Sequence, residues 1–127
     1  MKLDKYEQSL LDGWEEMYKK GQLTLWILLA LKDDPKHMAS IKDFIKKSTN
    51  GSLSADDQSM YRALRRYYDA ELVDYEEQPG DNGPGRKVYK LTSIGQKVLA
   101  NFVTRNITKV FFDPDIKSLL KETNHVS

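Results

Sequence analysis

Residues 54–91 read SADDQSMYRALRRYYDAELVDYEEQPGDNGPGRKVYKL, and this stretch decides the fold of the 127-residue chain. It opens with a predicted helix that ends near Ala70, because Met60, Leu64 and Tyr67 fall on one face at about 100° per residue. Its candidate N-caps are Ser54, Asp56 and Asp57. The polar residues on its other side are Gln58, Ser59, Arg62, Arg65, Arg66 and Asp69. The helix therefore has one face for a core and another for a partner.

A β-hairpin is predicted directly after this helix. Residues 72–75 and 86–91 are its strands, and the second strand alternates strictly between polar and apolar side chains. Residues 78–85 are rich in glycine and proline, which is typical of a turn. Arg86 and Lys87 stand where this loop rejoins the second strand, so the hairpin presents two cations at its outer end.

Charge changes sign along the hairpin. Residues 71–81 contain five acidic and no basic residues, whereas residues 84–112 contain six basic and no acidic residues. A surface polarised in this way can steer toward phosphate although the net charge is only +1. Chance clustering on an ordinary solvated surface remains the alternative explanation.

Hydrophobic periodicity predicts further helices on both sides of this stretch. Three precede it, over about residues 3–20, 23–31 and 36–47, and the second is so apolar that we expect it at the centre of the core. One long helix follows, starting at Thr92 or Ser93. The breaks between these helices are expected at Gly21, Asp33-Asp34-Pro35, Asn50-Gly51 and Asp113-Pro114. A short additional turn of helix is expected at Ile116, Leu119 and Leu120.

Helices followed by a two-stranded hairpin predict a mainly α fold with a small β-hairpin, the winged helix-turn-helix. In that fold an outer helix face fits the major groove of DNA, and the wing adds basic residues against the flanking backbone. The candidate DNA-binding residues are Gln58, Ser59, Arg62, Arg65, Arg66, Arg86 and Lys87. A solvated helix face, with the arginines paired to Asp69 or Glu71, is the structural alternative.

Three segments resemble the PadR family of transcriptional regulators. Residues 22–31 resemble its first core helix, and Ser48-Thr49-Asn50-Gly51 precede the second segment. Residues 59–67, Ser-Met-Tyr-Arg-Ala-Leu-Arg-Arg-Tyr, are similar to that family's pattern of a tyrosine, a leucine and a basic pair on the recognition helix. Residues 83–95 resemble its wing signature of glycines, arginine-lysine, tyrosine, leucine-threonine and a further glycine. The resemblance covers about residues 20–100 and points to the short, multidrug-regulator-like branch. The departures from the family pattern are His37-Met38-Ala39, Asp56, Asp57 and Tyr67.

The resemblance implies a sequence-specific regulator of transcription that binds double-stranded operator DNA, in the family's usual mode a repressor released by a small-molecule effector. It also implies a homodimer that pairs through the helices outside the wing domain. The expected division is an N-terminal dimerisation helix at 1–20, a DNA-binding domain at 21–92 and a C-terminal helix and tail for dimerisation at 93–127. Apolar stripes on the outer helices support dimerisation independently. The candidate dimerisation residues are Leu10, Trp14, Leu99, Phe102 and Val103.

The effector and the rival function rest on fewer residues. Trp14 and Trp26 are candidates for stacking on a small aromatic effector, and two ordinary core or interface tryptophans are the alternative reading. A winged-helix module that binds another protein without contacting DNA is the alternative function, favoured by the net charge of +1 and by the acidic first strand of the hairpin.

Composition excludes several other classes. The longest apolar run, residues 25–31, is far shorter than the roughly 20 residues of a membrane span, and the N-terminus carries no apolar signal segment, so we expect a cytoplasmic protein. The chain has no cysteine, which excludes disulfides and thiolate metal sites. Its two histidines, His37 and His125, have no metal-ligand spacing. We therefore expect neither an enzyme, with catalytic residues, nor a metal or cofactor.

Overall fold

The computed structural model describes residues 2–80, 83 and 85–123 of the chain. The chain divides into two compact units, residues 19–99 and residues 1–18 together with 100–127. Parts of the predicted wing loop (Asp81, Asn82 and Pro84) and of the predicted C-terminal tail, with His125, lie outside the described residues. In the described ranges, no helix has both the length and the apolar character that crossing a bilayer requires.

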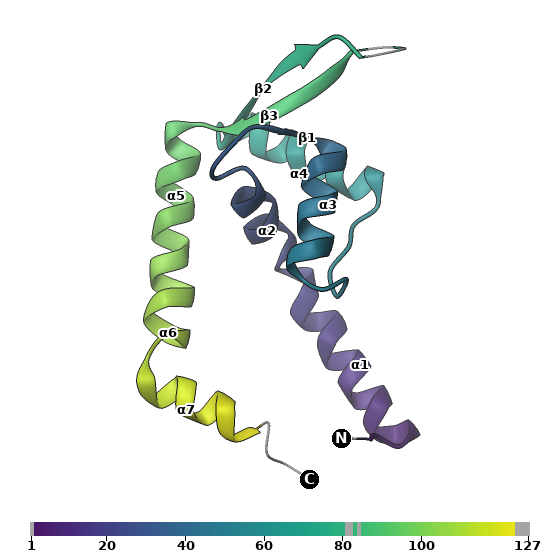
Figure 1. Cartoon of the computed structure of the whole chain (residues 1–127), viewed down its shortest axis with the longest axis vertical. Coiled ribbons are helices and arrows are strands. Elements are labelled where there is room, and N and C mark those ends of the chain that lie inside the picture. Colours follow the sequence, from purple (N-terminus) through teal and green to yellow (C-terminus); the bar gives the residue numbers. More distant parts are fainter. Residues whose placement is uncertain (1, 81–82, 84, 124–127) are drawn as a thin grey trace. The chain divides into compact units, whose positions relative to one another are not determined.

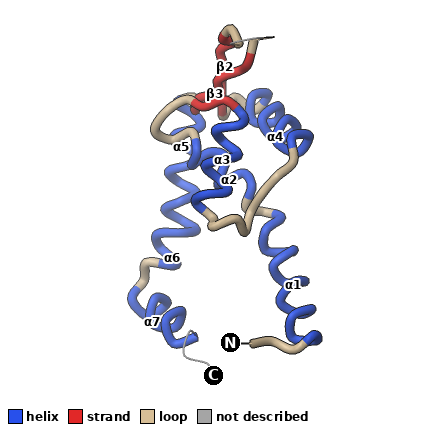
Figure 2. Tube along the Cα trace, turned by 45° about the vertical axis from the view of Figure 1, so that its right-hand side comes forward, coloured by secondary structure: helices blue, strands red, loops and turns tan. Residues whose placement is uncertain are grey.

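Among its described residues, the unit of residues 19–99 contains three whole helices, an antiparallel sheet and the first part of α5 (Ser93–Val103). The helices are α2 (Leu23–Ala30), α3 (Met38–Ser48) and α4 (Asp57–Asp69). The strands are β1 (Lys36–His37), β2 (Val73–Gln78) and β3 (Arg86–Leu91), in the order β1-β3-β2. Figure 1 shows the β2–β3 hairpin extending beyond the helices, and Figure 2 shows the same from a second direction. The predicted winged-helix arrangement, mainly α with a small hairpin, is confirmed.

The start of the third helix was predicted wrongly. Lys36 and His37 were expected in a helix, but they pair with Tyr89 and Val88 of β3 and form the short edge strand β1. Helix α3 begins at Met38, directly after this strand, where the His37 ring accepts a hydrogen bond from the Ser40 backbone N–H (N···Nδ1 3.3 Å). A two-residue strand has no periodicity of its own, so only its partner strand reveals it.

The core is built from one face of each helix and the inner side of the sheet. Helix α2 is central as predicted, because Ile27, Leu28 and Ala30 are all buried. The other fully buried large side chains are Ile41, Ile45, Met60, Leu64 and Val73. Tyr67 also lies in the core, and its hydroxyl hydrogen-bonds with the Thr24 hydroxyl (O···O 2.6 Å), so this polar atom is satisfied.

Several close contacts fix the hairpin to the end of α4. The Leu72 N–H donates to the Tyr67 carbonyl at 2.8 Å, and Glu71 between them adopts a left-handed φ of 64°. The Thr92 hydroxyl donates to the Glu71 carbonyl at 2.5 Å. A Cβ on Gly95 would lie 2.1 Å from the Leu72 carbonyl oxygen, so only glycine fits there. The hairpin is therefore held in a defined position beside α4.

The outer helices carry most of the exposed apolar surface. Helix α1 (Lys5–Lys20) has no buried residue. Helix α5 (Ser93–Val103) is followed by a π-helical segment η1 (Thr104–Thr108), by α6 (Lys109–Phe111) and, after Asp113, by α7 (Pro114–Thr123). The break at Asp113-Pro114 lies where it was predicted, but the short turn expected beyond it is a helix of 10 residues, capped by the Asp113 carboxylate.

The predicted dimerisation residues differ in exposure. Trp14 is 72% exposed, Leu10 57% and Phe102 45%, and Val103 is half-buried. Leu99 is only 3% exposed, so its side chain is already covered within its own chain. Its place in an exposed stripe was therefore predicted wrongly, because the helix that carries it also packs against the core.

Candidate nucleic-acid interface

Helix α4 presents a strongly divided surface. Its start is fixed by Asp56, one of the three predicted caps, whose carboxylate accepts a hydrogen bond from the Ser59 backbone N–H at 2.7 Å. Met60, Leu64 and Tyr67 are buried as the periodicity predicts, and the opposite face is open. The predicted DNA-binding residues on that open face are exposed, apart from the half-buried Ser59: Gln58, Ser59, Arg62, Arg65 and Arg66.

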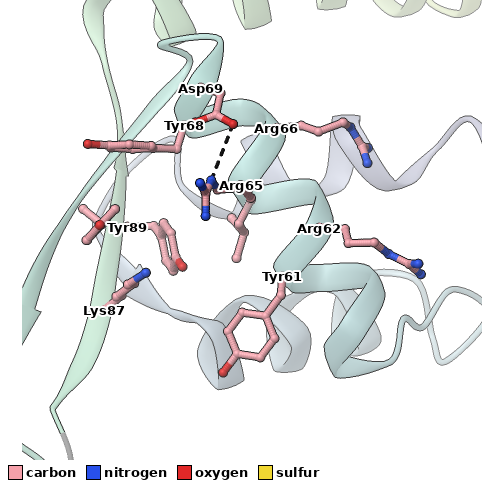
Figure 3. A pocket seen from close by; sticks show the side chains of 10 residues that line it. Tyr61, Arg62, Arg65, Arg66, Tyr68, Asp69, Lys87 and Tyr89 are labelled. Carbon is pink, nitrogen blue, oxygen red and sulfur yellow. Dashed lines mark ion pairs between the residues drawn. The ribbon is translucent and has the colours of Figure 1, made fainter.

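A groove of about 680 Å³ lies between α4 and the hairpin (Figure 3). It combines three predicted arginines of α4 with the predicted lysine of the wing and with four tyrosines. Among the described residues that line it, Asp69 is the single carboxylate. The lining residues are Tyr61, Arg62, Leu64, Arg65, Arg66, Tyr68, Asp69, Tyr75, Lys87 and Tyr89. The groove therefore brings together cationic and aromatic groups from α4 and from the wing, the two elements for which the sequence predicts DNA binding.

The three arginines of α4 leave the helix on two sides. Figure 3 shows Arg65 extending toward the hairpin, where its Nε lies 3.5 Å from an Asp69 carboxylate oxygen. Arg62 and Arg66 extend toward the other side of the helix. The pair of Arg65 with Asp69 joins two well-exposed side chains and is therefore weak. All three guanidinium groups are available to an incoming anion.

The tyrosines were missed as site residues. Tyr75 of β2 packs against Tyr68 of α4 and Tyr89 of β3, with ring centroids 5.0 and 5.7 Å apart. Burial raises the pKa of the Tyr89 hydroxyl, and the neighbouring phenols of Tyr61 and Tyr75 raise it further, so Tyr89 stays neutral. The alternation of side chains along the strands predicts that Tyr75 and Tyr89 share one face of the hairpin. It does not predict which other element packs against that face.

The register of the hairpin alters the interpretation of its charges. Asp74 pairs with Lys90 and Glu77 pairs with Lys87, so two acidic residues of β2 stand opposite two basic residues of β3. Opposite charges that stand directly opposed across two strands favour the pairing of those strands. The acidic and basic segments of the sequence therefore do not form two separate patches, because residues of both segments alternate across the hairpin.

Arg86 and Lys87 do not share one face of the wing. Successive side chains of a strand point to opposite faces, so Lys87 shares its face with Tyr89 and Arg86 does not. Both residues line a second groove of about 360 Å³. Its other lining residues are His37, Met38, Ala39, Tyr61, Gly85 and Tyr89. Tyr61, Lys87 and Tyr89 line both grooves, so the two grooves adjoin at these three residues.

The two acids at the start of α4 are both engaged. Asp57 forms an ion pair with Lys42 of α3 at 2.6 Å. Hydrogen bonds from the backbone and side chain of Ser59 hold the pKa of Asp56 below its usual value of 3.8, and the charges of Arg62 and Lys42 lower it further. Because these cations offset both carboxylates, the acidic start of α4 repels phosphate less than its sequence suggests.

The lowered pKa of Asp56 predicts an acid-dependent loss of stability. A carboxyl whose pKa is depressed in the folded state stabilises that state above the unfolded pKa, near 3.8, and this contribution disappears as the pH falls through the folded pKa. We expect Asp56→Asn, which keeps an acceptor for the cap but does not titrate, to flatten the dependence of the thermal midpoint on pH between about 5 and 2.5. An unchanged slope in calorimetry would contradict the assignment. Asp43→Asn, within α3, serves as the matched control.

The two tryptophans lie in different units of the chain. Trp14 is 72% exposed on α1, whereas Trp26 is half-buried on α2 and its indole N–H donates to the Gln22 side chain at 3.4 Å. An effector pocket shared by the two stays a prediction. In the part of the chain that the structure describes, no group of three or more histidine, aspartate or glutamate side chains is arranged to hold a metal ion.

Comparison with known proteins places this geometry in a family. A family model described as the transcriptional regulator PadR-like family matches residues 27–101, which is more than half of the chain. The match spans α3, α4 and the hairpin, the elements that form both grooves. No curated protein sequence matches the chain at a significant level.

Solved structures of similar fold cover most of the chain. A PadR-like transcription factor from Bacteroides fragilis is 27% identical, with a TM-score of 0.61, and the match covers 91% of this chain and 100% of that one. A PadR-family regulator from Eggerthella lenta is 19% identical, with a TM-score of 0.65 and coverage of 77% and 83%. The Bacillus subtilis PadR in complex with operator DNA is 21% identical, with a TM-score of 0.59, and the match covers 64% of this chain and 46% of that one.

Proposed function

The chain belongs to the PadR-like family of transcriptional regulators, and on that premise we propose that it binds double-stranded operator DNA sequence-specifically as a homodimer. We further propose that it represses transcription and that a small aromatic effector releases it. Residues 21–92 bind DNA in this proposal, and the helices in residues 1–20 and 93–127 pair two copies.

The groove between α4 and β3 is the observation that carries DNA binding. Arg62, Arg65 and Arg66 of the helix and Lys87 of the strand line it, against one carboxylate among its described lining residues. Arginine presents a planar set of donors that matches the acceptor pair of guanine or the oxygens of a phosphate. The relative from Bacillus subtilis was solved with operator DNA bound, which supports the same use of this fold.

Helix α4 is the element we assign to the major groove. Its buried face packs against the core, so its exposed face can contact base edges without any change in the fold. The hairpin is anchored at the end of α4 through Leu72 and Thr92, which holds the wing at a defined distance for contact with the flanking backbone. This arrangement separates the reading of sequence from the positioning of the protein on the duplex.

A homodimer is supported by the exposed apolar side chains of α1 and α5. An apolar surface of this kind on a charge-rich chain marks an association site. The side chains concerned are Tyr6, Leu10, Trp14, Met17, Val98 and Phe102, each between 45% and 74% exposed. A two-fold dimer would place two copies of α4 side by side for two half-sites of one operator.

Release by an effector is testable through the two tryptophans, the only ones in the chain. Planar aromatic molecules stack on indole rings and quench their fluorescence. We expect a hydroxycinnamic acid, used as the probe, to quench emission saturably in the native protein and to lower duplex affinity over the same concentration range. Quenching without a change in duplex binding would remove the effector from regulation.

DNA binding itself is tested by the salt dependence of duplex affinity. Cognate fragments are first selected from sheared genomic DNA by the immobilised protein, and one is then titrated by fluorescence anisotropy at several salt concentrations. We expect log affinity to fall with log salt by roughly 0.9 per phosphate contact. A flat dependence with weak, sequence-independent binding would favour the alternative of a protein-interaction module.

The wing is expected to position the protein without reading sequence. Replacing Arg86 and Lys87 together by alanine should lower affinity for the cognate and for a random duplex by similar factors, because phosphate contacts carry no sequence information. The slope of log affinity against log salt should fall by up to about 2. A selective loss of cognate binding at an unchanged slope would contradict this division of roles.

A further inference from the structure

One face of the hairpin brings a cation and two aromatic rings together beside α4. In the register of the sheet, Tyr75 stands opposite Tyr89 and Glu77 stands opposite Lys87. Opposed residues of an antiparallel pair point to the same face. Tyr75, Lys87 and Tyr89 line the groove together with residues of α4, so this face is the one that looks toward the helix.

Tyr75 is at the centre of these contacts. Its ring centroid lies 5.0 Å from that of Tyr68 on α4 and 5.7 Å from that of Tyr89 on β3, both at tilted angles near 50°. The Lys87 ammonium lies 4.5 Å from the same centroid, within the range of a cation–π contact. One ring therefore touches the helix, the neighbouring strand and the wing lysine.

Lys87 has a second possible partner in the carboxylate of Glu77, which stands opposite it in the ladder. A lysine side chain is long and flexible, and its strongly hydrated ammonium is readily captured by a nearby carboxylate. The contact with the Tyr75 ring directs the ammonium toward the groove, into which Arg65 also extends. Without the ring, we expect the ammonium to turn toward Glu77 and be neutralised there.

We propose that Tyr75 is a positioning residue of the DNA interface, whose ring, packed between Tyr68 and Tyr89, holds the Lys87 ammonium over the groove for contact with a phosphate. This rests on the proposed DNA-binding function. Tyr75 itself makes no contact with the nucleic acid in this scheme and acts through Lys87. The aromatic face is required, and the hydroxyl is not, because phenylalanine offers a similar ring to a cation.

The experiment compares Tyr75→Phe, Tyr75→Leu, Lys87→Ala and the double variant Tyr75→Leu/Lys87→Ala. Each full-length protein is titrated with a random-sequence duplex at several salt concentrations. We expect Tyr75→Phe to match the wild type. Tyr75→Leu should bind about threefold to tenfold more weakly at low salt, with a salt slope lower by about 0.9, and Lys87→Ala should do the same. The double variant should be no weaker than Lys87→Ala alone.

A rescue variant and a spectroscopic readout separate positioning from folding. Adding Glu77→Gln to Tyr75→Leu should restore part of the lost salt slope, because the carboxylate that neutralises Lys87 is then absent. If the loss came from an unfolded hairpin, this second substitution would not restore the slope. Ring-current shifts of the Lys87 side-chain resonances should be present in the wild type and in Tyr75→Phe and absent in Tyr75→Leu. Lys47→Ala, at an exposed cation of α3 that does not line the groove, is the control and should bind as the wild type does.

The outcomes distinguish this inference from the proposed function. If the wild type shows no salt-dependent duplex binding, the proposed function fails and the inference fails with it. If the wild type binds but Tyr75→Leu keeps the full salt slope, or the losses of Tyr75→Leu and Lys87→Ala add in the double variant, the positioning role alone is overturned.

Discussion

Arg62→Ala and Arg65→Ala are each expected to weaken binding to the cognate duplex by about 1–3 kcal/mol, a loss of roughly fivefold to 150-fold. Both side chains are on the open face of α4, and neither belongs to the core, so neither substitution should unfold the protein. The ion pair of Arg65 with Asp69 joins two exposed groups and contributes little to folding. The loss therefore reports on the interface.

The pattern of losses matters as much as their size. Removing a guanidinium that pairs with a base should lower affinity for the cognate duplex more than affinity for a random duplex. Removing one that contacts only phosphate should lower both affinities equally. We expect the first pattern for Arg65, which faces the groove, and anisotropy titrations with both duplexes measure it. Lys47→Ala, an exposed cation of α3 that does not line the groove, is the control. Unchanged binding in both arginine variants would remove α4 from the DNA interface.

Phe102→Glu is expected to convert the proposed dimer into monomers at micromolar concentration. Phe102 is 45% exposed in the single chain, so a charge there is tolerated by the monomer but would be buried at an apolar interface, where an unpaired charge is strongly unfavourable. Trp14→Glu, at a side chain that is 72% exposed, should have the same effect from α1. Because an operator of two half-sites needs two linked copies of α4, cognate affinity should fall as well.

Sedimentation velocity measures this change, and the melting curve of each variant reports whether the monomer stays folded. Gln8→Glu adds the same charge to the opposite side of α1, at an exposed position, and should leave the dimer intact. A folded dimer with both Phe102→Glu and Trp14→Glu would show that these faces do not pair. Leu99→Ala is no substitute for these variants, since Leu99 is buried in its own chain and its truncation would act on folding.

The sequence by itself determined the elements whose signals are local. The spacing of Met60, Leu64 and Tyr67 predicted α4 and its buried face, and the arginines between them were expected on the open side, where the structure has them. Glycine and proline in residues 78–85 predicted the turn of the hairpin. These features depend on neighbours within one or two turns of chain, so periodicity and turn chemistry were sufficient.

The tertiary structure decided everything that depends on residues distant in the sequence. Strand β1 exists only because Lys36 and His37 pair with β3, more than fifty positions later. The segregated charges of the hairpin became opposed pairs once its register was set, and Leu99 turned out to be covered by the core. The aromatic groove likewise needs Tyr68, Tyr75 and Tyr89 from three elements. A periodic pattern shows which side chains share a face. The segment that covers this face is determined by packing between distant parts of the chain, because a side chain is buried only where another segment packs against it.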